Sequence, residues 1–277
     1  MLETTTSWVF HQFYLSVYLY FKELLARHQL SNLINMYKLF FLLFLSVILS
    51  CQSNNPNIVA TPNKEANPPA TGFLLAESDS KAIQIADEVM QAMGGRAAWD
   101  AVDTLAWNFF GKRDLVWSKK SGDVTITNPS EKSALTINVF SGKGTAKYDG
   151  QEVTDPDSLK IDMKKAMNIW INDSYWLAMP FKLKDTGVRL KYLGEEATAD
   201  DQPADKLELT FFETGNTPGN KYHVYVDKKT RLVTQWDFFR KADDPKPRFS
   251  MPWKGYVEVD GILLSEDRGK RRVEVVK

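Results

Sequence analysis

Side chains capable of acid–base or nucleophilic catalysis form no recognisable motif in this sequence. His223 is the only histidine after residue 51, and no G-x-S-x-G turn accompanies it. The sequence contains no H-E-x-x-H, no Cys/His cluster and no glycine-rich phosphate loop. Asp200, Asp201 and Asp205 lie close together, but their spacing matches no calcium-binding loop, so a solvated loop explains them. We therefore predict no catalytic residue, no metal site and no cofactor.

A pair of carboxylates from distant parts of the chain is one catalytic arrangement that would leave no local motif. Glycoside hydrolysis uses two carboxyl groups about 5–10 Å apart, and Asp237 and Glu258 are conceivable partners. An envelope hydrolase acting on glycans or lipids is therefore an alternative function, through such a pair or through His223 and a nucleophile.

The single cysteine, Cys51, follows a segment that is typical of secretion signals. Lys38 begins this segment, an apolar run covers 39–49, and Ser50 precedes the cysteine. The 11-residue run would span roughly 16 Å as a helix, too short for a bilayer core of about 30 Å. The residues 48–51 (Ile-Leu-Ser-Cys) resemble the bacterial lipobox. This resemblance implies that Cys51 is acylated and becomes the mature N-terminus. Two or more acyl chains would then hold the protein firmly to a membrane.

The sequence divides into four parts around this cysteine. Residues 1–35 are interpreted as an extension upstream of the true initiator, Met36; the alternative is an additional amphipathic helix that touches the membrane. Residues 36–50 form the signal peptide. Residues 51–79 are rich in Asn and Pro and are expected to be a flexible tether that begins at the lipidated cysteine. Residues 80–277 are expected to form one domain.

The pattern of this domain indicates an α+β fold that is mostly β. A helix is predicted from Ser80, as its cap, to Met93, and a second from Asp155 to Pro180 with a break near Asn172-Asp173. Alternating apolar residues predict strands before and after the second helix, joined by turns such as Asp149-Gly150. Short connections require antiparallel pairing. We therefore expect a twisted antiparallel sheet with helices covering one face.

This order of elements resembles the outer-membrane lipoprotein carrier and receptor superfamily (LolA/LolB-like). The resemblance covers residues 80–277 and rests on short motifs: Ala92-Met93-Gly94-Gly95 leading to Trp99 and Leu105, Tyr225-x-Asp227, Val233-x-x-Trp236, Trp253-x-x-Tyr256 and Asp260-Gly261-Ile262. It implies a half-open β-barrel, closed on one side by helices, around an apolar cavity for acyl chains. The carrier of this family is soluble, whereas this chain is expected to be anchored, which favours a receptor-like or unrelated binding role. No functional side chain of the family can be placed on a position here.

Aromatic residues on the inward face of the predicted sheet and helix are the candidate ligand cavity. They are Trp107, Phe109, Trp117, Trp170, Phe211, Trp236, Phe238 and Trp253. We therefore expect an envelope lipoprotein, anchored through Cys51 and facing the periplasm from the outer membrane, that binds a lipid, acyl chain or other apolar molecule. A scaffold that binds another protein is a third possibility, although the sequence identifies no partner. Lys plus Arg and Asp plus Glu each number 35, and this balance gives no indication of nucleic-acid binding.

Overall fold

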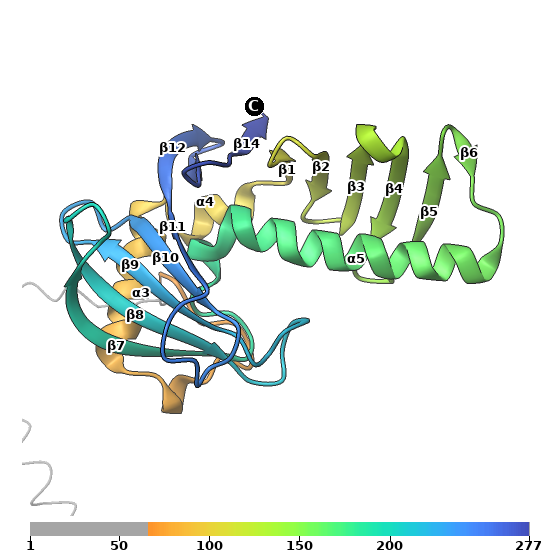
Figure 1. The fold of residues 1–277 in the computed structure, drawn as a ribbon. Helices are drawn as coiled ribbons and strands as arrows, with labels where there is room; N and C mark the ends of the chain where they lie inside the picture. The colour runs from red at the N-terminus through yellow and green to blue at the C-terminus, as the bar shows by residue number, and fades with distance from the viewer. Residues whose placement is uncertain (1–65, 277) are drawn as a thin grey trace, which may run out of the picture. The chain divides into compact units, whose positions relative to one another are not determined.

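Antiparallel strands make up most of the computed structural model, which describes residues 66–276 (Figure 1). The extension, the signal peptide and Cys51 lie outside these residues. The described strands form three sheets, of which the largest has seven strands in the order β14-β1-β2-β3-β4-β5-β6. Their bounds are β1 Thr104–Phe109, β2 Arg113–Ser118, β3 Asp123–Asn128, β4 Ser133–Asn138, β5 Lys143–Tyr148, β6 Gln151–Glu152 and β14 Val273–Val276. The predicted α+β class, mostly antiparallel β with helices against the sheets, is confirmed.

The other two sheets come from the second half of the chain. The five-stranded sheet has the order β11-β10-β9-β8-β7, and a separate hairpin pairs β12 with β13. Their bounds are β7 Val188–Ala197, β8 Pro203–Phe211, β9 Lys221–Asp227, β10 Val233–Phe239, β11 Phe249–Pro252, β12 Lys254–Val259 and β13 Ile262–Asp267. After β13 the chain returns to the seven-stranded sheet, where Val276 of β14 lies opposite Ala106 of β1. The sequence predicted one sheet, whereas hydrogen bonding divides the strands among three sheets.

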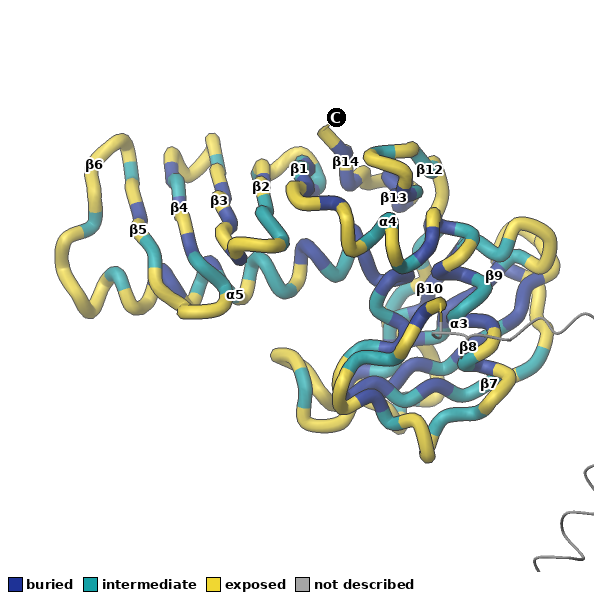
Figure 2. Tube along the Cα trace, turned by 180° about the vertical axis from the view of Figure 1, so that it is seen from behind, coloured by how far each residue is buried: buried dark blue, intermediate teal, exposed yellow. Residues whose placement is uncertain are grey.

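Two-residue turns join several strands, as the Asp-Gly pairs predicted. Asp149 and Gly150 both have positive φ, and so do Asp260 and Gly261. Such backbone twist matches the twist of a hairpin and is favoured by Asp followed by Gly. Within the strands of the seven-stranded sheet, buried and exposed residues alternate (Figure 2). This sheet therefore has one covered face and one solvated face.

A 23-residue helix, α5 (Pro156–Ala178), runs across the strands of the seven-stranded sheet and covers one face (Figure 1). Its predicted start is confirmed, because the Asp155 carboxylate accepts a hydrogen bond from the Ser158 amide and Pro156 occupies the first turn. The predicted break near Asn172-Asp173 is wrong, and α5 continues to Ala178, followed by the 3-10 helix η3 (Met179–Lys182). Asp173 faces the sheet and pairs with Arg113 there, so it does not interrupt the helix.

The first long helix, α3 (Ser80–Ala92), packs against β7 and η3. Its buried stripe includes Ala82, Ile85, Ala86 and Val89, the spacing expected of an amphipathic helix. Asp79, rather than Ser80, is the capping residue, and it makes no side-chain bond to the helix. The helix ends before Gly94, where a Cβ atom would lie 2.2 Å from the Gly261 oxygen. The glycine is therefore needed for close approach of this turn to the β12–β13 hairpin. A short helix, α4 (Arg96–Ala101), follows.

Residues 66–79, which composition assigns to the tether, pack on the domain. Phe73 is 8% exposed and belongs to the hydrophobic core. The Leu74 amide donates to the Val188 oxygen at 2.9 Å, and the Asp79 amide donates to the Leu190 oxygen at 3.0 Å. This segment includes the 3-10 helix η1 (Leu75–Glu77) and covers β7, an edge strand whose free backbone groups would otherwise invite pairing with another chain. Between residues 66 and 276, no helix is both long enough and apolar enough to cross a bilayer.

Candidate functional site

Three hollows lie along α5, and neighbouring hollows share residues of this helix. The aromatic cleft is lined by Trp170, Tyr175, Trp176, Phe211 and Tyr222, together with polar residues at its rim. The polar cleft lies between α5 and strands β2 to β4, and the lysine groove lies between the start of α5 and the β4–β5 turn. Asn168 lines both the groove and the polar cleft, and Asn172 lines both the polar and the aromatic cleft. Helix α5 therefore contributes lining residues to three hollows of different chemistry.

The aromatic cleft has a volume of about 460 Å³, within the range of small-molecule sites. Helix α5 contributes Tyr175, whose ring centroid lies 5.5 Å from that of Tyr222 and 6.2 Å from that of Phe211 on the five-stranded sheet. Tyr222 stacks on Trp236 with centroids 5.0 Å apart, and Trp236 meets Trp176 edge-on at 4.6 Å. Interlocked rings therefore form one wall of the cleft, and the cleft itself stays open.

Two hydrogen-bond donors in the lining of this cleft have no partner among the described residues. The Tyr175 hydroxyl and the Trp170 indole Nε1 are both buried atoms. Burial also raises the pKa of Tyr175 well above its ordinary value, so the hydroxyl keeps its proton. A buried donor without an acceptor costs about 1–3 kcal/mol. Because both atoms are shielded from solvent, a ligand oxygen reaches them only after neighbouring side chains move, and it would then remove this cost.

The rim of the aromatic cleft is polar. Lys182 and Asp185 form an ion pair there, and Thr186, Thr214 and Thr217 add hydroxyl groups. The Asn216 side-chain amide donates to the Asn168 side-chain oxygen at 3.0 Å, which ties the β8–β9 loop to α5. An apolar interior with a polar rim suits a molecule that has an apolar part and a polar end.

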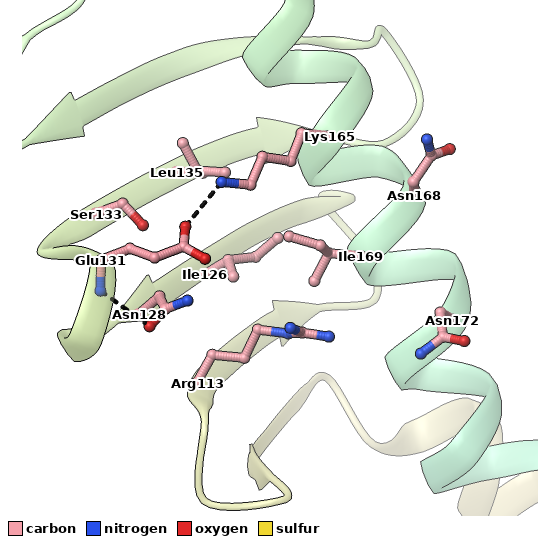
Figure 3. A pocket seen from close by; sticks show the side chains of 10 residues that line it. All are labelled: Arg113, Ile126, Asn128, Glu131, Ser133, Leu135, Lys165, Asn168, Ile169 and Asn172. Carbon is pink, nitrogen blue, oxygen red and sulfur yellow. Dashed lines mark hydrogen bonds and ion pairs between the residues drawn. The ribbon is translucent and has the colours of Figure 1, made fainter.

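The polar cleft has a volume of about 470 Å³ and is lined by three charged side chains, Arg113, Glu131 and Lys165 (Figure 3). Lys165 reaches from α5 to Glu131, with Nζ 2.8 Å from Oε2 (Figure 3). This contact lowers the pKa of Glu131 and raises that of Lys165. Arg113 extends from β2 toward α5 (Figure 3), where Asp173 neutralises it. The cleft therefore offers hydrogen-bonding groups without a net charge.

Two carboxylates of α5 face the sheet and fasten the helix to it. The Asp173 side chain is fully buried and accepts from Arg113 at both oxygens, Nε to Oδ2 at 2.7 Å and Nη2 to Oδ1 at 2.9 Å. Burial raises the pKa of Asp173, while Arg113 and Asn172 oppose the shift. Asp162 accepts from the Tyr148 hydroxyl at 2.6 Å, and this bond raises the pKa of Tyr148. These contacts fix the position of the helix that lines all three hollows.

The aromatic residues predicted to line a cavity are distributed over several elements. Of this set, Trp170 and Phe211 line the aromatic cleft. Trp107, Trp236 and Trp253 are at most 1% exposed and belong to the core, as does Phe109. Trp117 and Phe238 are partly buried against that core. The structure brings together Trp117 with Trp170, at 5.4 Å between centroids, and Trp236 with Trp253, at 5.2 Å. The set does not form one continuous lining.

The cleft residues that sequence reasoning missed are Tyr175, Trp176 and Tyr222. Tyr222 could have been found, because it alternates with the buried Val224 and Val226 along β9. Tyr175 and Trp176 follow the predicted helix break, and the cleft wall they form depends on that break being absent.

Of the residues considered for hydrolysis, Asp237 and Glu258 lie on different sheets, whereas His223 on β9 lies directly opposite Asp237 on β10. Asp237 on β10 accepts from the Tyr225 hydroxyl at 2.9 Å and from Gln235 Nε2 at 3.0 Å, whereas Glu258 lies on β12. His223 packs against Phe239 with ring centroids 4.5 Å apart, and burial lowers its pKa. No hydrogen bond or ion pair joins Asp237 to Glu258 in the described part of the chain. Across residues 66–276, no three His, Cys, Asp or Glu side chains converge in a way that could hold a metal ion.

Comparisons with known proteins give structural similarities at low sequence identity. No protein-family profile matches the chain, and no curated protein is significantly similar to it. A DUF1329 family protein from Desulfovibrio piger is 14% identical with a TM-score of 0.34, covering 67% of this chain and 83% of that one. A LolA superfamily protein from Nitrosomonas europaea is 12% identical with a TM-score of 0.34, covering 70% and 89%. MucB, solved in complex with MucA, is 14% identical with a TM-score of 0.19, covering 57% and 49%. These similarities do not assign the chain to a family.

Proposed function

We propose that this protein is an envelope lipoprotein that binds a lipid, an acyl chain or another apolar molecule in the aromatic cleft. The observation that carries the proposal is a cleft of about 460 Å³ lined by five aromatic rings, with two buried donors that lack a partner in the described structure. The ligand fills the apolar interior and offers an acceptor oxygen to Tyr175 and Trp170. The order of elements, with strands on either side of α5, supports a LolA/LolB-like relationship as part of this proposal.

Methyl laurate and dodecane provide a test, because they share an alkyl chain and differ by an ester. In displacement of the neutral fluorophore N-phenyl-1-naphthylamine, we expect the ester to bind about five- to 150-fold more tightly, since it satisfies a buried donor worth about 1–3 kcal/mol. The Tyr175→Phe variant keeps the ring and loses the hydroxyl, so this preference should shrink while dodecane binding stays unchanged.

Phe211 and the next residue, Phe212, supply a matched pair of variants for the same assay. Phe211 lines the cleft, whereas Phe212 is 60% exposed and is not part of the lining. Phe211→Ala should weaken both ligands by about 1–2 kcal/mol, roughly five- to thirtyfold, because apolar contact is lost. Phe212→Ala should leave both affinities unchanged. Equal effects of the two substitutions, or no displacement by either ligand, would rule out this cleft as the binding site.

The proposed anchor is a lipid attached to Cys51, with the domain facing the periplasm from the outer membrane. It is supported by the apolar run before the cysteine and by the Asn- and Pro-rich residues after it. We expect Cys51→Ala to abolish incorporation of radiolabelled palmitate. Cys51→Ser, which replaces the thiol by a hydroxyl and cannot form the thioether to the lipid, should behave as alanine does. Palmitate incorporation into either variant would contradict the anchor.

A further inference from the structure

The lysine groove differs from the two clefts in its charge. It has a volume of about 610 Å³ and lies between α5 and the β4–β5 turn. Its apolar lining includes Ile137, Leu159, Met163 and Met167. Gly144 belongs to the same lining, and a Cβ atom there would lie 2.7 Å from the Met163 sulfur. Close packing of β5 against α5 therefore gives the groove an apolar floor, with two flexible methionines in it.

Three lysines, Lys143, Lys160 and Lys164, line this groove. None of them forms an ion pair with a carboxylate of residues 66–276, whereas the neighbouring Lys165 pairs with Glu131. Asp162, the acidic residue between them on α5, is buried and accepts a hydrogen bond from Tyr148. The groove thus presents three lysines without an ion-pair partner in the described structure, next to apolar surface.

The same two elements carry the most exposed large apolar side chains of the described residues. Phe140 in the β4–β5 turn is 72% exposed, and Ile161 on α5 is 69% exposed. Phe140 precedes Lys143 by three positions, and Ile161 lies between Lys160 and Lys164 in sequence. Exposed apolar residues interspersed with lysines are typical of surfaces that lie in the interface of a membrane.

We propose that the lysine groove, with Phe140 and Ile161, is a surface that docks on an anionic lipid bilayer. The cations are all lysines, which act as hydrated point charges and suit a diffuse layer of head groups. A peptide carboxylate is better recognised by the planar fork of arginine, and no arginine lines the groove. The lysine stems can cover the apolar floor while their ammonium groups reach the phosphates. This surface does not depend on the ligand in the aromatic cleft. It would orient a domain that the proposed anchor brings to the membrane.

A fluorophore at position 161, next to the groove lysines in sequence, distinguishes docking from anchoring. The full chain would carry Cys51→Ala, to leave one labelling site, and Ile161→Cys coupled to an environment-sensitive dye. With vesicles containing phosphatidylglycerol, we expect a blue shift and quenching by brominated lipid; with phosphatidylcholine alone, the response should be small. Each lysine near an anionic surface adds about fivefold, so K143Q/K160Q/K164Q should raise the half-maximal lipid concentration on the order of a hundredfold.

Two controls test whether the dye response comes from this surface, and not from positive charge elsewhere on the domain or from the apolar signal segment. K229Q/K246Q/K270Q removes the same charge from exposed lysines outside the groove and should leave the response at position 161 unchanged. A dye at Leu193→Cys, on β7 and 46% exposed, should show no shift. An equal response in neutral vesicles, indifference to the groove substitutions, or a response to polyglutamate in place of vesicles would overturn the proposal. The last outcome would assign the groove to an acidic protein segment. Loss of methyl laurate binding in the Phe211→Ala variant would leave this surface unaffected.

Discussion

An Arg113→Met variant is expected to lose about 3–5 kcal/mol of stability, because it leaves the buried Asp173 carboxylate without its cation. The carboxylate is fully buried and both of its oxygens accept from Arg113, at 2.7 and 2.9 Å. Methionine retains apolar volume and removes the charge, so the loss reports mainly on the stranded carboxylate. Urea unfolding at pH 7, followed by circular dichroism, measures the difference.

The double variant Arg113→Met/Asp173→Asn supplies the control. Replacing both partners by uncharged groups removes the stranded charge, so the double variant should be more stable than Arg113→Met alone. An exposed pair gives the opposite comparison: Lys132 and Asp149 are 69% and 76% exposed, and Lys132→Met should cost less than about 1 kcal/mol.

The loss of unfolding free energy in Arg113→Met should also shrink as the pH falls. Burial already raises the pKa of Asp173 in the native protein, and loss of Arg113 removes the main opposing influence. A carboxyl whose folded pKa lies above its unfolded pKa binds protons more readily when folded. Its unfavourable contribution is therefore present at neutral pH and disappears as the pH drops below the unfolded value, near 4. A deficit that is constant from pH 7 to about pH 4, or a double variant as unstable as the single one, would show that this carboxylate does not cause the loss.

The prediction of the strands succeeded where the sequence pattern is local. Alternation along β1 and the Asp149-Gly150 turn each depend on neighbouring residues, and the structure confirms them. The division into three sheets depends on long-range pairing, such as that of Val276 with Ala106. Alternation indicates which face of a strand is buried, without indicating which element covers that face.

The candidate site was harder to predict for the same reason. Trp107 and Trp236 alternate as cavity residues would, yet both are core residues at most 1% exposed. The aromatic cleft instead depends on the continuity of α5 through Asp173, which places Tyr175 and Trp176 opposite Tyr222. An Asn-Asp pair in a sequence usually favours a helix end, because such side chains compete for backbone hydrogen bonds. Here the ion pair with Arg113, 60 residues away, overrides that preference.

Arg268 is the second position where a large loss is expected, because a buried cation there fastens α5 to the β12–β13 hairpin. It is 1% exposed and lies over the Trp253 ring, with Cζ 3.5 Å from the centroid. Its guanidinium donates to the Trp176 carbonyl at 2.8 Å and to the Ser265 hydroxyl at 2.7 Å. Burial lowers the pKa of Arg268 to about 9, which still leaves it charged at neutral pH. Arg268→Ala should therefore cost about 3–5 kcal/mol, through a cavity and through carbonyls that lose their donors.

Arg271 is a matched control for this second prediction, because it also lies over an aromatic ring. Its Cζ is 5.2 Å from the Phe110 centroid, but the residue is exposed, so Arg271→Ala should cost less than about 1 kcal/mol. Arg268→Lys should not restore stability, since a single ammonium cannot reproduce the forked contacts to Trp176 and Ser265.

Because the Trp176 ring lines the aromatic cleft, Arg268→Ala should also weaken methyl laurate binding under conditions where the variant is folded. Equal costs for the two alanine substitutions would mean that burial of the cation contributes nothing specific. If Arg268→Ala lost much stability but kept its ligand affinity, the Trp176 ring would hold its position without the hydrogen bond from Arg268 to the Trp176 carbonyl.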